Sequence, residues 1–136
     1  MGAHQSVEKS MKEQNYIKTP IAKVWPIAPG IVRVMYDEVV TNPDDVHAHI
    51  EQLREEFGDG LWLLSDLRQM KKTNQEVRQA LSSGKIVAVG AAVIMGNGLS
   101  KIIGNLFLKF SKPTITTRIF TDEEKAIEWL KEQATK

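Results

Sequence analysis

The stretch that decides the fold is IVAVGAAVIM, residues 86–95, followed by Gly96-Asn97-Gly98, an amphipathic segment over 99–110 and the run TITTRIF over 114–120. The first run is apolar without alternation, which is typical of a strand covered on both faces. TITTRIF leads directly into Thr121-Asp122-Glu123-Glu124, a capping box that predicts the start of a closing helix. Strand, helix, strand and helix in this order predict an α/β fold.

Upstream of this unit, the chain is predicted to begin with a β-hairpin. Residues 16–25 and 31–40 have the apolar character of strands, and Pro26-Ile27-Ala28-Pro29-Gly30 between them supplies turn residues. A link this short favours antiparallel pairing of the two strands.

Two further helices are predicted on either side of a short strand. Asn42-Pro43-Asp44-Asp45 combines a capping residue, a proline and first-turn acids, and the helix that it opens ends at Gly58 or Gly60. Residues 61–64 form a short buried strand, and Thr73-Asn74-Gln75-Glu76 is a second capping box. Strands separated by helices imply right-handed crossovers. We therefore expect an α/β fold with one mixed, mostly parallel sheet of about five strands and about four helices.

Length and composition describe an ordinary globular protein. The 136 residues suffice for one domain, and we expect a disordered polar arm over 1–14 and a domain over 15–136. The net charge of +1 gives no argument for nucleic-acid binding, and the absence of cysteine removes disulfides and thiolate sites. The longest apolar run, 86–95, is about half the ~20 residues of a spanning helix, so we expect no stable membrane insertion. We expect a cytoplasmic protein without a cofactor.

Three segments carry a resemblance to a known family: Leu64-Ser65-Asp66-Leu67-Arg68, Ile102-Ile103-Gly104-Asn105-Leu106-Phe107, and Lys112-Pro113 with residues 118–130. With the element order, they make residues 18–132 similar to STAS domains, the SpoIIAA-like fold of bacterial anti-sigma-factor antagonists. They are also similar to the uncharacterised bacterial proteins grouped as STAS or CRAL-TRIO-like. The resemblance implies a STAS-like regulatory or protein-interaction module, and the CRAL-TRIO likeness implies an apolar or lipid ligand. Antagonist STAS domains carry a phosphorylatable serine in an Asp-Ser-Ser-Gly-like turn; residues 65–73 lack that turn, so we do not transfer this switch.

Two polar segments are candidate ligand sites. Asp66 and Arg68 follow a predicted strand, at the edge where open α/β sheets bind ligands, and could anchor a polar ligand or pair with each other. Alternatively, Asp66 caps the following turn and Arg68 is solvated. Gly96, Asn97 and Gly98 precede a helix and offer backbone N–H groups to an anion. The third glycine of a dinucleotide fingerprint is missing, so a simple turn is the favoured interpretation of this segment.

The segment over 99–110 is the main candidate for an interaction surface. Its apolar stripe, which includes Ile103 and Phe107, predicts a helix that faces the core, and an apolar ligand held between helix and sheet would contact these two residues. The residues proposed for a protein contact are Gly104, Leu108, Lys109 and Trp129. Trp129 either closes the edge of the core, which we favour, or meets a partner.

No motif supports catalysis or a metal site. His47 and His49 lie roughly 200° apart around a helix axis and cannot chelate one ion. We therefore expect a non-catalytic module that binds a protein partner or a second copy of itself. Binding of a small molecule or lipid beside 99–110 is the alternative, and an enzyme that uses Asp66 is the least supported hypothesis.

Overall fold

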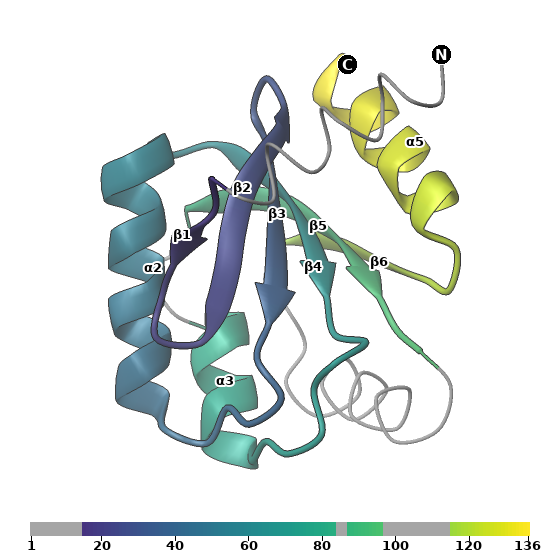
Figure 1. Cartoon of the computed structure of the whole chain (residues 1–136). Helices are drawn as coiled ribbons and strands as arrows, with labels where there is room; N and C mark the ends of the chain where they lie inside the picture. Colours follow the sequence, from purple (N-terminus) through teal and green to yellow (C-terminus); the bar gives the residue numbers. More distant parts are fainter. Residues whose placement is uncertain (1–14, 84–86, 97–114) are drawn as a thin grey trace.

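The structure is a computed structural model that describes residues 15–83, 87–96 and 115–136 (Figure 1). These residues form one sheet of six strands, ordered in space as they are in the sequence. The strands are β1 (Ile17–Lys18), β2 (Ala22–Ala28), β3 (Ile31–Tyr36), β4 (Leu61–Asp66), β5 (Ala88–Ile94) and β6 (Thr116–Phe120). The helices are α2 (Pro43–Phe57), α3 (Gln75–Ser83) and α5 (Glu123–Ala134).

The sheet is antiparallel at its start and parallel in the rest. β1 pairs with β2, and β2 with β3, in antiparallel register, whereas β3, β4, β5 and β6 are parallel neighbours. This arrangement confirms the predicted mixed, mostly parallel sheet with an N-terminal hairpin. The helix predicted over 99–110 lies outside the described residues.

The predicted first strand over 16–25 is wrong, because the chain breaks into β1 and β2. Pro20 stands in the break and has no N–H to donate to a ladder. The Thr19 hydroxyl oxygen accepts from the backbone N–H groups of Ile21 and Ala22, at 3.3 and 3.0 Å, and so stabilises a turn there. β2 then continues through Pro26, and the chain reverses only at Pro29 and Gly30, where Gly30 has a φ of 76°.

The helix caps agree with the sequence pattern in α2 and differ from it in α3 and α5. Asn42 accepts from the N–H of Asp44 at the start of α2, and Gly58 ends that helix. At α3, Asn74 rather than Thr73 is the capping side chain, since its Oδ1 accepts from Val77 N at 2.9 Å. At α5 the cap is Asp122, one residue after the predicted Thr121-first box.

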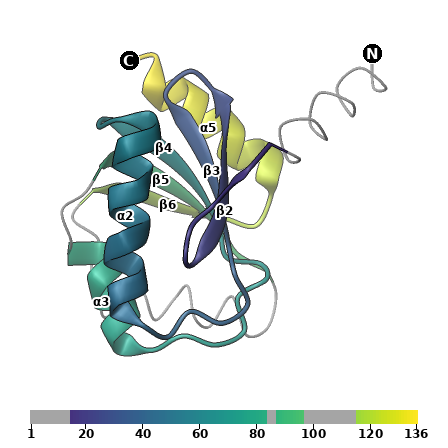
Figure 2. The same cartoon turned by 60° about the vertical axis from the view of Figure 1, so that its left-hand side comes forward.

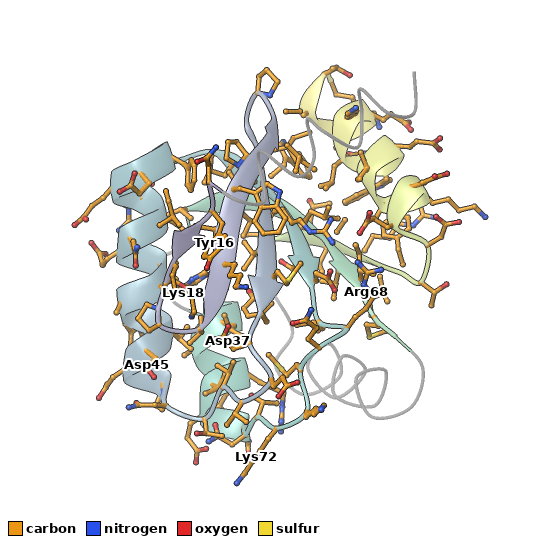
Figure 3. All side chains as sticks on the ribbon, viewed as in Figure 1. Tyr16, Lys18, Asp37, Asp45, Arg68 and Lys72 are labelled. Carbon is orange, nitrogen blue, oxygen red and sulfur yellow. The ribbon has the colours of Figure 1, made fainter. Side chains whose placement is uncertain are left out.

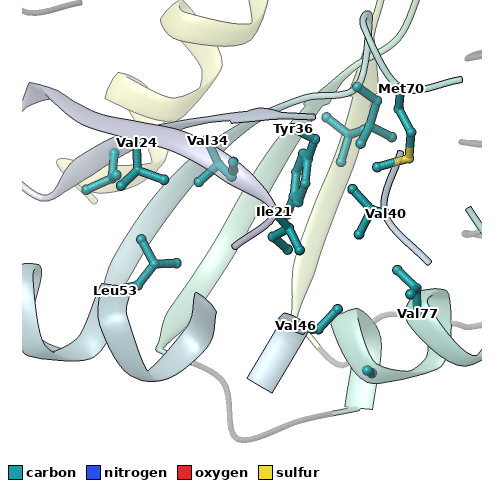
Figure 4. Packing of buried hydrophobic residues seen from close by; sticks show 14 of the residues in the cluster. Ile21, Val24, Val34, Tyr36, Val40, Val46, Leu53, Met70 and Val77 are labelled. Carbon is teal, nitrogen blue, oxygen red and sulfur yellow. The ribbon is translucent and has the colours of Figure 1, made fainter. Parts of the chain in front are cut away.

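The sheet separates two apolar clusters. α2 and α3 share one cluster with the sheet, which includes Val24, Val34, Val46, Leu53 and Val77 (Figure 4). α5 packs on the opposite side of the sheet (Figure 2), where Ala126 and Leu130 are fully buried against Leu64, Ala92 and Ile94. β5 is buried on both faces as predicted, except for Val89, which is 48% exposed at a register shift between β4 and β5.

Candidate functional site

Asp66 is the last residue of β4, and Arg68 lies two residues beyond it. Asp66 is only 3% exposed, and its Oδ1 accepts from the backbone N–H and from Nε of Arg68, both at 3.0 Å. Its Oδ2 accepts from Arg68 Nη2 at 2.8 Å. The carboxylate therefore both caps the turn after β4 and holds the Arg68 side chain, which combines two of the roles considered from the sequence.

Two residues that the sequence analysis missed complete this site. Arg33, from the middle of β3, donates through Nη2 to Asp66 Oδ2 at 2.8 Å and to Glu123 Oε1 at 2.7 Å. Arg68 Nη2 also donates to Glu123 Oε1 at 2.7 Å. We call Arg33, Asp66, Arg68 and Glu123 the charged cluster; it joins β3, β4 and the first turn of α5.

Strand register explains why these side chains meet. Arg33 lies between Val32 and Val34, which belong to the cluster under α2, so Arg33 points to the face that α5 covers. Glu123 is the first residue of α5, where the positive end of the helix dipole also favours a carboxylate. One signal was present in the sequence: a lone arginine within the apolar strand IVRVMY requires an anionic partner when it is buried.

The charged cluster is electrically neutral, with two guanidinium groups and two carboxylates. Burial by itself raises the pKa of Asp66, but the hydrogen bonds from Arg68 and the charges of Arg68 and Arg33 outweigh it, so that pKa lies below its ordinary value. The hydrogen bond to Asp66, followed by the interaction with Glu123, raises the pKa of Arg68. Asp66 and Arg68 therefore keep their charges near neutral pH.

This electrostatic setting makes Asp66 unsuited to proton transfer. A general base works best with a pKa near the working pH, and both oxygens of Asp66 already accept hydrogen bonds from arginine. Arg33 Nε has no hydrogen-bond partner among the described residues, but the Arg33 guanidinium carbon lies 5.6 Å from the ring centroid of Trp25, a cation–π distance. Chemically, the charged cluster fastens α5 to the sheet.

The described strands lack the reversal of order at which open α/β sheets usually form a ligand crevice. Such crevices form where the strand order reverses, and β3 to β6 follow one another without reversal. α2 and α3 lie together on one face, and α5 lies on the other. The position of Asp66 and Arg68 at a strand end therefore does not by itself place them in such a crevice.

A second polar cluster lies beneath α2, around His49. The His49 Nδ1 lies 2.8 Å from the Thr19 hydroxyl, and its ring is 6.1 Å from that of Tyr36. Burial, followed by the charge of Lys18, lowers the pKa of His49 to about 4. Burial raises the pKa of Tyr36 to about 12, against the effect of its hydrogen bond with Ser65. His47 is exposed, on another side of α2 from the buried His49.

Aromatic side chains gather between α5 and the sheet. Trp62, Phe120 and Trp129 are partly buried, and the Trp129 ring lies 6.0 Å from Trp62 and 5.8 Å from Phe120. We call these three the aromatic cluster. Gly90 lies beneath Trp62, and a Cβ atom at Gly90 would overlap three carbons of the indole ring. Trp129 thus sits at the edge of the core.

The other residues proposed from the sequence are distributed as follows. Gly96 lies two residues after the end of β5 and is partly buried. The residues that lie outside the described part of the chain are Asn97, Gly98, Ile103, Gly104, Phe107, Leu108 and Lys109. Within the described ranges, no group of three His, Asp or Glu side chains is placed to hold a metal. None of the helices described is long and apolar enough to cross a bilayer.

The hairpin, the parallel strands and the helices on both faces define a SpoIIAA-like α/β module. A solved structure supports this class: an uncharacterised protein of the DUF3478 family with a SpoIIAA-like fold, from Shewanella loihica PV-4. It is 16% identical, with a TM-score of 0.52 over 74% of this chain and 83% of that one, and shows the fold alone. The resemblance to SpoIIAA-like proteins expected from the sequence is therefore confirmed.

A family assignment follows from the sequence comparison. The chain belongs to the family described as a domain of unknown function, DUF7793, whose model matches residues 26–134. The search of curated proteins found no significant match.

Proposed function

We propose that this chain is a non-catalytic interaction module of the STAS-like type, which binds a protein partner or a second copy of itself. The observation that carries the proposal is the contrast between its two clusters on the α5 side of the sheet. The four members of the charged cluster balance one another's charges through ion pairs, whereas the aromatic cluster is only partly buried. Partly exposed tryptophan and arginine are the residue types that contribute most to protein interfaces.

The charged cluster argues against two other functions. An anionic ligand would compete with Glu123 and Asp66 for the arginines, and a cationic ligand would meet the same competition from Arg33 and Arg68. Asp66 is held as an ion and is poorly suited to catalysis, which leaves binding through the surface as the better-supported activity.

Native mass spectrometry of the purified full chain, sprayed gently from a volatile buffer, tests the proposal. We expect a mass equal to that of the chain or of its dimer, because an interaction module needs no bound small molecule. Extra mass that leaves on collisional activation would contradict the proposal and support the small-molecule or lipid alternative. Chemical cross-linking in cell extract, followed by peptide mapping, then distinguishes a heterologous partner from a second copy.

A further inference from the structure

In the part of the chain that the structure describes, no strand pairs with the outer edge of β6. β6 is the last strand in the sheet order, and among the described residues only β5 is its neighbour (Figure 1). Met95 N donates to Phe120 O at 3.0 Å, so the backbone of Phe120 faces β5. Successive residues of a strand direct their N–H and C=O groups to alternate edges. The backbone groups of Thr117 and Ile119 therefore face away from β5, toward the outer edge.

Arg118 is the middle residue of this edge strand and carries a charge that the described residues do not neutralise. Its side chain is exposed, and its guanidinium carbon lies 5.1 Å from the centroid of the Phe120 ring. Within the described part of the chain, Arg118 makes no ion pair. Phe120 lies on the α5 side of the sheet, and Trp129 is 5.8 Å from it, so cation and aromatic surface adjoin.

We propose that this edge binds an extended, acidic segment of a partner protein, which adds to the sheet as a further strand beside β6. Thr117 and Ile119 would supply the backbone hydrogen bonds, and a carboxylate of the partner would pair with Arg118. An apolar residue two positions from that carboxylate would lie on the same face and contact Phe120. The proposal rests on the interaction function proposed above and names the surface and the chemistry of the partner.

Charge decides between such a partner and a second copy of the chain. Antiparallel pairing of β6 with its own copy about the strand centre would place two Arg118 side chains directly opposite each other. Like charges in directly opposed cross-strand positions are destabilising, whereas opposite charges are favourable. An acidic strand is therefore the better occupant of this edge.

Fluorescence anisotropy with a labelled peptide tests the proposal on the full chain. The probe is the heptapeptide Thr-Val-Glu-Val-Phe-Val-Thr, and its control has lysine in place of glutamate. We expect the acidic probe to bind about tenfold more tightly than its control, since opposite charges attract across a strand pair and like charges repel. Raising the salt concentration to about 0.5 M should reduce that ratio.

Two substitutions examine the charge and the backbone separately. Arg118→Glu should reverse the preference between the two peptides. Thr117→Pro removes an outward N–H and leaves the bonds to β5 in place, so binding of both peptides should fall several-fold with little loss of stability. Lys72→Glu is the matched charge control, because Lys72 is exposed in the loop before α3, away from β6 (Figure 3). It should leave binding unchanged.

The outcomes separate the edge proposal from the broader function. Equal binding of the two peptides, no binding of the acidic probe up to about 1 mM, or insensitivity to Arg118→Glu would overturn the edge proposal. A urea titration of each variant checks its folding; if Thr117→Pro is unfolded, Arg118→Glu carries the test. A dimer or cross-linked partner that survives both substitutions would overturn the edge proposal and leave the interaction function standing. Loss of the function itself would appear instead as a bound small molecule in the native mass spectrum.

Discussion

Replacing Arg33 by methionine should lower the free energy of unfolding by about 3 kcal/mol. Arg33 is 5% exposed and neutralises Asp66 and Glu123 from the middle of β3. Methionine keeps much of the apolar stem but removes the guanidinium group. Asp66 would then keep only the charge of Arg68 among its described partners, an arginine that also pairs with Glu123, and Asp66 would remain almost fully buried.

The magnitude follows from the hydrogen bonds that are lost. Arg33 donates two charge-assisted bonds, at 2.8 Å to Asp66 and 2.7 Å to Glu123. Each such bond contributes about 1.5–3 kcal/mol. Removing one partner of a buried ion pair costs about 3–5 kcal/mol, because it leaves an uncompensated charge. Asp66 keeps three hydrogen bonds from Arg68, and the variant no longer desolvates a guanidinium group, so the lower end of that range applies.

Urea unfolding followed by tryptophan fluorescence measures this effect. With a slope of about 2 kcal/mol per molar urea, a loss of about 3 kcal/mol lowers the midpoint by roughly 1.5 M. Arg54→Met is the matched control, because Arg54 makes two ion pairs, with Glu51 and Asp59, on the surface of the protein. Exposed ion pairs contribute about 0–1 kcal/mol, so its midpoint should hardly move.

The pH dependence gives an independent check on the cause. The pKa of Asp66 is lowered in the folded protein, so its contribution to stability is present above the pKa of an unfolded aspartate and is lost as the pH falls through the lower folded value. The difference between wild type and Arg33→Met should therefore narrow below about pH 4. Two results would refute the conclusion that the charged cluster stabilises the packing of α5 on the sheet. One is an equal loss of unfolding free energy in Arg33→Met and Arg54→Met; the other is a stability difference between wild type and Arg33→Met that persists unchanged to about pH 2.

Three further predictions concern other parts of the fold. Gly90→Ala should lose about 1–3 kcal/mol by urea titration, because its methyl group overlaps the Trp62 ring, and Trp62→Leu should recover part of the loss; additive losses would contradict this. Since the pKa of His49 is lowered to about 4, stability should fall by about 3 kcal/mol as the pH drops from about 6.5 to 4, and His49→Gln should flatten that slope. Asn74→Ala should lower the free energy of unfolding by about 1 kcal/mol, whereas Thr73→Val should leave it unchanged. A larger loss for Thr73→Val than for Asn74→Ala would make Thr73 the cap of α3.

Local sequence signals predicted helices and strands well where a residue type favours a single local structure. Asn42 and Pro43 opened α2 as expected, because a capping side chain and a proline without N–H both fit a helix start. The first strand failed because Pro20 and Thr19 act together: proline breaks the ladder and the threonine hydroxyl supplies the turn. The apolar residues on either side of that break gave no sign of it.

The cap of α3 shows where a local pattern is insufficient. Thr73 and Asn74 are both good capping residues, and the capping-box spacing favours Thr73. A distant contact decides between them, since the Asn74 amide nitrogen donates to Thr41 O at 2.7 Å and thereby holds the side chain at the helix start. The Thr73 hydroxyl is buried and finds no hydrogen-bond partner in the described part of the chain. Propensity therefore located the helix start to within one residue, and tertiary structure selected the cap.

Only the local half of the charged cluster could be predicted from the sequence, because tertiary structure determines the other half. Pairing of Asp66 with Arg68 is local and was one of the alternatives considered. Arg33 and Glu123 are 90 residues apart and meet only because the parallel register of β3 and β4, and the docking of α5, bring them together. A shift of one residue in strand register would turn Arg33 to the opposite face of the sheet, so no local pattern could have fixed the contact.

Arg33 and Arg118 lie on the same face of the sheet and differ in burial, and this difference determines which of them can attract a ligand. Arg33 is inside the protein, where an unpaired guanidinium group is too costly, and two carboxylates neutralise it. That pairing leaves Arg33 with little further electrostatic attraction to offer to a ligand. Arg118 is exposed, and water allows it to remain without an ion pair among the described residues. It lies beside an aromatic ring, on a strand whose outer edge pairs with none of the described strands. Its attraction for an anion is therefore still available, which is why we expect a partner at β6 rather than at Asp66.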